Sequence, residues 1–311
     1  MARLIVSRLA TLIPLMLIAT SIVFFLVRFV PGDPVRIMVG GQRISEANVQ
    51  SIREQYRLDK PLLAQYGYWL NDLAHGSLGD SFRQRAPVRD LVLERLPITL
   101  ELACYAFLIS MLISIPLGII SALRRNSWID VGASVFSLIG ASSPVFFTSI
   151  LLILVFAYKL QWMPALGQGD GGWDTVKHLT MPAIALGLSL AAITTRITRN
   201  GMIEALSQDY MVTARAKGLS PRSIVFKHAL RNALIPIVTV AALQFGFLLV
   251  GTVLVEYTFG IGGLGSLLVD SVQRRDYPVV QGTTVFIAIA FIVLNLAVDI
   301  LYAIIDPRIK Y

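Results

Sequence analysis

Charged side chains are scarce in this chain, and cysteine and histidine are scarcer still. Only 15% of its 311 residues are charged, whereas soluble domains carry about 25%. A single cysteine, Cys104, excludes an internal disulfide. The three histidines, His75, His178 and His228, lie far apart in the sequence, and none has a partner at the spacing of metal ligands. The sequence therefore predicts neither a disulfide-stabilised fold nor a metal site.

Motifs for catalysis and for nucleotide binding are also missing. The sequence has no GxxxxGK[ST] phosphate loop and no HExxH, and no local motif suggests a Ser/His/Asp or Cys/His set. Two segments match GxGxxG, at 167–172 and 260–265, but both lie between apolar runs rather than after a strand. We therefore predict a protein that is not an enzyme, with no catalytic residues and no cofactor of its own.

Long apolar runs are what the chain has instead. Hydrophobic residues make up 55% of the sequence, and a helix that spans a membrane needs about 20 mostly apolar residues. We predict six spans, at about 9–27, 98–123, 131–158, 181–195, 234–255 and 283–305. Pro144 should kink the third of them. The predicted fold class is an all-α membrane protein with six transmembrane helices.

The distribution of Lys and Arg predicts the orientation. The net charge is +8, and membrane proteins keep Lys and Arg on cytoplasmic loops, so a basic balance here does not indicate nucleic-acid binding. Both termini then lie in the cytoplasm with most basic residues of the short segments: Arg3, Arg8, Arg124, Arg125, Arg196, Arg199, Arg215, Lys217, Arg222, Lys227, Arg231, Arg308 and Lys310. The short outer segments hold only Lys159, Lys177, Arg274 and Arg275.

We divide the chain into three parts. Residues 1–30 form the cytoplasmic end and the first span, and residues 98–311 form a five-span core with a cytoplasmic loop at 200–232. Residues 31–97 form an extracytoplasmic helical region that begins with the helix-breaking run Pro31–Pro34. One stripe of this region has helical spacing and suits a helix lying on the membrane surface or packed on the bundle: Leu62, Tyr66, Trp69, Leu70 and Leu73.

The basic stretch at 200–236 is the most informative one, because its punctuation predicts two short helices with a sharp joint. Gly218 suits the left-handed end of the first helix. Ser220 suits the N-cap of the second, with Pro221 in its first turn. Ala214 and Gly218 are small residues four apart, which predicts a stripe that another surface can approach closely. A DNA-binding helix-turn-helix has no room here, because spans flank the stretch on both sides.

Several motifs of the chain resemble one family of transport proteins. They are Asp209-Tyr210, 213–218 (TARAKG), 228–232 (HALRN) with Pro236, Pro31–Pro34, 274–279 (RRDYPV) and 306–309 (DPRI). The stretch at 209–236 is similar to the cytoplasmic "EAA" loop of bacterial ATP-binding-cassette (ABC) importer permeases, in the dipeptide, oligopeptide, glutathione and nickel branch. Val212, Thr213 and Ala214 stand where the broad consensus has an acidic residue and two alanines. The same branch shares this departure from the consensus.

This resemblance implies a type I ABC importer permease in the bacterial inner membrane. Such a chain forms half of a pathway with a second, homologous permease subunit, in a heterodimer. Two cytoplasmic ATPase subunits bind ATP and Mg²⁺, and an extracytoplasmic binding protein delivers the substrate. The residues implied to couple to the ATPases are Asp209, Tyr210, Thr213, Ala214, Arg215, Lys217, Gly218 and Leu219. Lipid surrounds the spans, and no nucleic acid is involved.

The pathway and the substrate stay open. Gln244, Glu256 and Asn295 are candidate pathway-lining residues, because polar groups in or near spans usually face the interior. Asp299 is expected to pair with Arg196 or Arg199. The solute is a dipeptide, an oligopeptide, glutathione, nickel or another small solute. A secondary carrier driven by an ion gradient is the alternative from another class, but it predicts an internal repeat that is not evident here.

Overall fold

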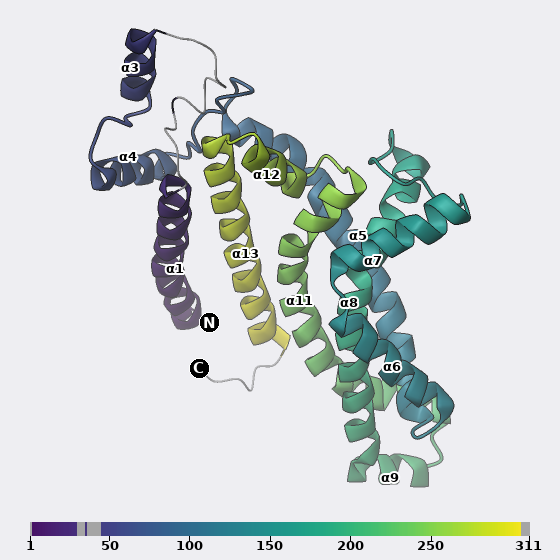
Figure 1. Ribbon diagram of the computed structural model, residues 1–311. Coiled ribbons are helices and arrows are strands. Elements are labelled where there is room, and N and C mark those ends of the chain that lie inside the picture. Colours follow the sequence, from purple (N-terminus) through teal and green to yellow (C-terminus); the bar gives the residue numbers. More distant parts are fainter. Residues whose placement is uncertain (1, 30–34, 36–44, 306–311) are drawn as a thin grey trace. The chain divides into compact units, whose positions relative to one another are not determined.

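The computed structural model describes the backbone of residues 2–29, 35 and 45–305, and the side chains of these residues except 2–11, 52, 55 and 299–305. The predicted break at Pro31–Pro34 lies outside these residues. The described secondary structure is helical apart from one isolated bridge between Asp80 and Pro87 (Figure 1). The chain forms two compact units: Met1–Pro97 with Gly263–Val293 (unit 1), and Ile98–Gly262 with Leu294–Tyr311 (unit 2). The units divide after Pro97, and residues 263–293 group with the N-terminal part.

Four or five helical segments in the described chain are long and apolar enough to cross a membrane. Four are α5 (Val88–Leu123), α8 (Gly172–Ser207), Pro221–Phe259, which ends in α11 (Leu230–Phe259), and α13 (Tyr277–Ile305). The fifth is a bent pair of α6 (Trp128–Ser142) with α7 (Val145–Leu152) and the π-helix η1 (Ile153–Lys159). The predicted first span lies in α1 (Ala2–Arg28), where 12–28 is a shorter apolar helix. An all-helical membrane protein is therefore confirmed.

Two spans are longer than the sequence indicated. Helix α5 begins at Val88 and runs through Pro97, and α8 continues past Arg196 and Arg199 to Ser207. The predicted span at 181–195 is thus only the middle of one long helix. Proline and arginine do not end these helices, because packed neighbours compensate for a lost backbone hydrogen bond and long cationic side chains reach toward polar surroundings.

The helix is interrupted completely at Pro144, where we predicted only a kink. Ser143 and Pro144 are both extended, with ψ of 125° and 133°. Helices α6 and α7 consequently meet at 108°. The ring of a proline disfavours the helical conformation of the residue before it, so α6 ends and α7 starts afresh at Val145.

Close helix packing in unit 2 depends on glycines. A Cβ added to Gly187 of α8 would lie 2.8 Å from the carbonyl oxygen of Ala106 in α5. A Cβ on Gly140 of α6 would lie 2.8 Å from the Cβ of Ala192 in α8. Small residues of this kind let helix backbones approach closely in membranes, where packing rather than water exclusion drives association. Helix α8 therefore lies at the centre of unit 2, with α5 and α6 packed directly against it.

We predict that Gly187→Ala destabilises unit 2 and that Gly132→Ala does not. Gly187→Ala forces a methyl group onto a backbone carbonyl and should cost about 1–3 kcal/mol. Gly132 lies in α6 with open space around its Cβ direction, so Gly132→Ala should be neutral or gain up to about 1 kcal/mol of helix propensity. Thermal unfolding in one detergent measures both. A higher melting temperature for Gly187→Ala than for Gly132→Ala would contradict this packing.

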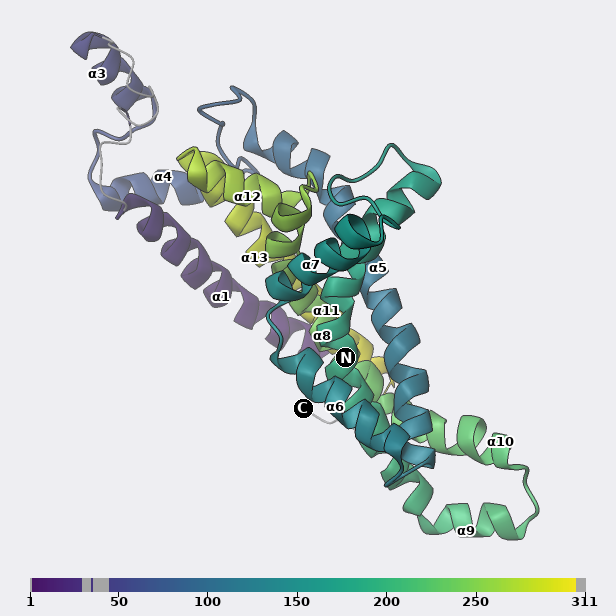
Figure 2. The ribbon, with the colours of Figure 1, turned by 45° about the vertical axis from the view of Figure 1, so that its right-hand side comes forward.

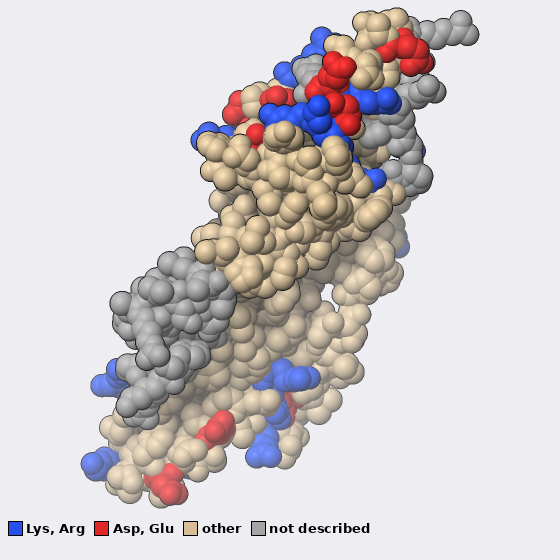
Figure 3. Space-filling model, turned by 90° about the vertical axis from the view of Figure 1, so that its left-hand side faces the viewer, with Lys and Arg blue, Asp and Glu red and all other residues tan. Residues whose placement is uncertain are grey.

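Unit 1 begins with α1 packed against α4 (Leu62–Ala74). The rings of Tyr66 and Trp69 lie 5.3 Å from the ring of Phe24, measured between centroids. The Tyr66 and Ser21 hydroxyls are hydrogen-bonded at 2.6 Å. Two residues of the predicted stripe, Tyr66 and Trp69, thus pack on a neighbouring helix. Charged side chains gather at the end of this unit that carries α3 (Glu46–Gln55) and α4 (Figure 3).

A buried aspartate joins two loops of unit 1. The Asp276 carboxylate, 3% exposed, accepts hydrogen bonds from the Ser81 hydroxyl at 2.6 Å and from the backbone amides of Phe82 and Arg83 at 3.2 Å. Burial, with the Asp80 and Asp276 carboxylates nearby, raises the pKa of Tyr56 above its usual value. The RRDYPV motif is therefore a structural junction between α13 and the segment that precedes α5.

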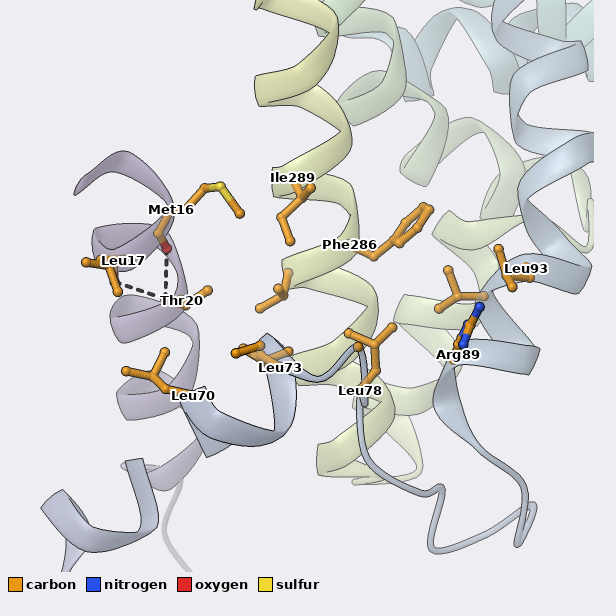
Figure 4. Close-up of a pocket in the computed structure, with 14 residues that line it drawn as sticks. Met16, Leu17, Thr20, Leu70, Leu73, Leu78, Arg89, Leu93, Phe286 and Ile289 are labelled. Atoms are coloured by element: carbon orange, nitrogen blue, oxygen red, sulfur yellow. Dashed lines mark hydrogen bonds between the residues drawn. The ribbon is translucent and has the colours of Figure 1, made fainter. Parts of the chain in front are cut away.

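Unit 1 also contains an open apolar pocket of about 560 Å³ (Figure 4). Side chains from α1, α4, α5 and α13 line it, among them Leu73, Leu93 and Phe286. The Thr20 hydroxyl at its edge donates to the carbonyls of Met16 and Leu17 in its own helix, at 2.8 and 3.0 Å. This hydroxyl is consequently satisfied without a ligand.

Candidate coupling surface

A sharp joint after α8 creates the loop of interest. Gln208 has ψ of 149°, which ends α8, and α9 (Asp209–Ala216) begins at the next residue. After the turn at 217–220, α10 (Pro221–Ser223) and the π-helix η2 (Ile224–Ala229) lead without a break into α11. Figure 2 shows α9 and α10 as the two arms of one loop at an end of unit 2. The predicted second short helix is therefore the start of a long one.

The turn between the arms follows the local predictions. Gly218 is left-handed, with φ of 74°. The amide of Gly218 donates to the carbonyl of Arg215 at 2.9 Å, and the amide of Leu219 to that of Ala214 at 3.3 Å. The Ser220 hydroxyl accepts from the amide of Ser223 at 3.4 Å, and Pro221 occupies the first turn. Such a capped turn fixes the direction in which the chain re-enters α11.

The inner face of α9 packs on its own chain. Met211 is fully buried among Met202 of α8, Ile224 of η2 and Ala233 of α11. Ala214, one turn further on, is only 7% exposed. This corrects the stripe predicted from Ala214 and Gly218, because Ala214 faces the bundle rather than a partner. Gly218 has open space where a Cβ would lie, so its left-handed backbone is what requires glycine.

The outer face of the loop combines charge with exposed apolar side chains. Asp209, Thr213, Arg215, Lys217 and Gly218 are exposed. Tyr210 and Leu219 are exposed as well, and the Tyr210 hydroxyl accepts a hydrogen bond from the Asn232 side chain. Sequence reasoning missed Val212 and Phe226, which are 62% and 61% exposed. Large apolar residues inside a cationic loop were the available signal.

An ion pair holds α6 to α8 near this loop. The Asp130 carboxylate, 4% exposed, accepts from the Arg199 guanidinium through both oxygens, at 2.8 Å for Nη2. It also accepts from the Ser121 hydroxyl at 2.6 Å and from the amide of Asn126 at 2.9 Å. Four hydrogen bonds compensate for burying this charge. The predicted pairing of Asp299 with Arg196 or Arg199 stays a prediction, because the Asp299 side chain lies outside the described set.

The candidate pathway residues do not gather at one place. Gln244 and Glu256 lie in α11 about 18 Å apart along the helix axis. Gln244 and Asn295 are half-buried, whereas Glu256 is fully buried and accepts a hydrogen bond from Thr99 at 2.7 Å. Among the described residues, no group of three or more His, Cys, Asp and Glu side chains could hold a metal ion.

These features define a helical membrane protein that presents a rigidly mounted loop on its surface. Two family models match the chain: "Binding-protein-dependent transport system inner membrane component" over residues 114–311, and the N-terminal model of the same membrane component over residues 1–103. The chain belongs to this family of ABC transporter permeases.

Curated relatives match over the full length. A putative peptide transport system permease protein of Brucella abortus is 41% identical over 316 residues, covering 100% of both chains. The glutathione transport system permease protein of Escherichia coli K12 is 41% identical over 307 residues, covering 99% of this chain and 98% of that protein. Among solved structures, the MetNI methionine ABC transporter in an inward-facing form matches with a TM-score of 0.56 at 18% identity, over 70% of this chain and 96% of the other.

Family membership establishes where the chain is located and which kinds of subunit it works with. It is a multi-pass subunit of the inner membrane, and it is not itself the ATPase, because ATP hydrolysis resides in partner subunits. A binding-protein-dependent system implies ATPase and binding-protein partners. No cofactor is expected in the permease subunit of this family.

Proposed function

We propose that this chain is one of two different permease subunits of an ATP-driven importer for small peptides, glutathione among them. In this proposal six spans cross the inner membrane, both termini and α9 lie in the cytoplasm, and residues 31–97 face outward. The observation that carries the substrate class is the full-length 41% identity to permeases named for peptide and for glutathione transport. The basic composition of the 200–232 segment supports the orientation.

Helix α9 is the proposed coupling helix, seated in a groove of an ATPase subunit. Met211 anchors its inner face, and the capped turn at Gly218 fixes its far end, so α9 would move together with α8 and α11. The exposed apolar side chains Val212 and Phe226 would supply the contact area, and Arg215 and Lys217 would pair with acidic groups at the rim. Closure of the two ATPases would then tilt the long helices that line the pathway.

Reconstitution with the binding protein and both ATPases tests the substrate class. We expect ATP-dependent accumulation of a labelled dipeptide or of glutathione in vesicles, with the binding protein setting the preference. Accumulation of nickel alone would mean that an importer of the same architecture transports a metal ion rather than a peptide. Uptake by the purified permease driven by an ion gradient, with no ATPase present, would favour the secondary carrier.

We predict that Val212→Ser weakens association with the ATPases without changing stability. Val212 is 62% exposed, so its loss leaves no cavity but removes apolar contact area from the proposed interface. Val272→Ser is the matched control, because Val272 is 56% exposed in α12 (Leu264–Gln273) of unit 1. Co-purification from mild detergent should fall about fivefold for Val212→Ser and stay unchanged for Val272→Ser. Equal recovery of the ATPases with both variants would remove Val212 from the interface.

A further inference from the structure

Unit 1 contains another pocket, of about 120 Å³, whose wall carries charged groups of both signs. Arg28, the last residue of α1, and Asp80, in the segment between α4 and α5, both line this Arg28 pocket. They form no ion pair with each other. A water molecule occupies about 30 Å³ in the liquid, so the pocket has room for the terminal group of a small solute.

Arg28 is held in place without a counter-ion. Its Nε donates to the Gln65 side-chain oxygen at 3.1 Å, and its guanidinium carbon lies 4.9 Å from the centre of the Phe24 ring. Gln65 is itself fixed, because it is only 8% exposed and donates to the carbonyl of Lys60 at 2.8 Å. Arg28 is half-buried and forms no ion pair with any carboxylate among the described residues. Half-buried arginines are normally paired, so Arg28 offers an oriented, uncompensated charge to a carboxylate.

The rest of the wall selects among carboxylates. The rings of Tyr56 and Phe82 pack edge to face with centroids 4.6 Å apart, and Trp69 also lines the pocket. Burial and the nearby Asp80 and Asp276 carboxylates raise the pKa of Tyr56, so Asp80 lies beside this aromatic wall. Asp80 is exposed, and its side chain has no hydrogen bond or ion pair within the described structure. It would repel a simple anion or a fatty acid but attract a ligand that also carries an ammonium group.

We propose that the Arg28 pocket binds a small solute with both a free carboxylate and a free ammonium group, which is an amino acid or a dipeptide with an apolar side chain. Arg28 binds the carboxylate, Asp80 attracts the ammonium group, and the aromatic rings cover the apolar side chain. The dipeptide as natural ligand rests on the proposed function. The permease would then contact the solute itself, at a site separate from the binding protein.

Calorimetric titration of the purified permease and ATPase complex, without the binding protein, tests the site with alanyl-leucine and with leucine as probes. We expect saturable binding of at least one of them. Arg28→Gln should weaken it at least tenfold and Asp80→Asn severalfold, since each removes a charged contact. Arg83→Gln is the matched control, because Arg83 is exposed in the same segment but does not line the pocket. The stronger ligand of the two decides between dipeptide and amino acid.

Two further variants and a labelled probe keep the test informative if Arg28→Gln does not fold. Arg28→Lys keeps the charge but not the planar fork, so its binding should lie between those of the unaltered protein and Arg28→Gln. Asp80→Asn changes an exposed side chain and should leave the melting temperature unchanged. Alanyl-photoleucine, which crosslinks on illumination, should label the segment at 56–82.

Four results would overturn the proposal. The first is the absence of saturable binding, and the second is equal binding by Arg28→Gln and Arg83→Gln. The third is equal affinity for alanyl-leucinamide, which lacks the carboxylate, or crosslinking only outside unit 1. The fourth concerns Asp33, the acidic residue nearest to Arg28 in the sequence, which lies outside the described residues. Equal losses of melting temperature in Asp33→Asn and Arg28→Gln would mean that the chain supplies its own counter-ion.

Uptake assays separate this site from the proposed function. Dipeptide uptake by the full system, with no dipeptide or amino-acid binding by the complex that lacks the binding protein, would overturn the site alone. Binding retained by a complex that accumulates no peptide in vesicles would overturn the proposed peptide specificity and leave the site in place.

Discussion

Replacement of Gly218 by valine should abolish ATP-dependent uptake while leaving the chain inserted in the membrane. The residue has φ of 74°, a conformation that β-branched side chains avoid at a cost of about 1–3 kcal/mol. The turn at Gly218 hydrogen-bonds back to Arg215 and Ala214, so its loss would leave the far end of α9 without the turn that directs the chain into the next helix. We expect uptake in reconstituted vesicles to fall at least tenfold, and ATPase co-purification to weaken in parallel.

Gly218→Asn tests whether glycine is required for its left-handed backbone or for its lack of a side chain. Asparagine adopts the left-handed conformation far more readily than valine, and open space surrounds the Cβ direction of Gly218 in this chain. Uptake by Gly218→Asn should therefore remain within a few-fold of the unaltered protein. If the asparagine variant were as inactive as the valine variant, close approach of a partner would be the reason for glycine, as the sequence alone first indicated.

Loss of the Asp130 carboxylate should be the most destabilising single change in unit 2. Asp130→Ala leaves the partly buried Arg199 guanidinium without its bidentate partner and also frees the Ser121 hydroxyl and the Asn126 amide. Breaking one side of a buried ion pair costs about 3–5 kcal/mol. We expect a markedly lower melting temperature in detergent and little folded complex in the membrane.

Two comparisons isolate the ion pair as the cause. Asp170→Ala removes an exposed aspartate from the loop before α8, and it should change stability by less than about 0.5 kcal/mol. The double variant Asp130→Ala with Arg199→Leu removes both charges and should recover part of the lost stability. A double variant less stable than Asp130→Ala alone would show that Arg199 has a second role in this bundle.

Short-range features of the site were predictable because neighbouring residues decide them. The left-handed turn at Gly218, the cap at Ser220 and the position of Pro221 follow from backbone conformation and from hydrogen bonds within a few residues. The membrane class followed in the same way from the length of the apolar runs. The direction of each α9 side chain did not follow, because the spacing of residues in a short helix shows which of them share a face but not what covers that face.

The sequence by itself determined a helical membrane protein with a capped, cationic loop between two of its long helices, since composition, apolar run length and local turn chemistry are properties of the chain. Only the tertiary structure decided that Ala214 faces inward, that α8 continues through Arg199, and that Asp130 is the partner of that arginine. Asp130 and Arg199 stand 69 positions apart. Their pairing depends on how α6 lies against α8, and close contacts such as that of Gly140 with Ala192 set that packing.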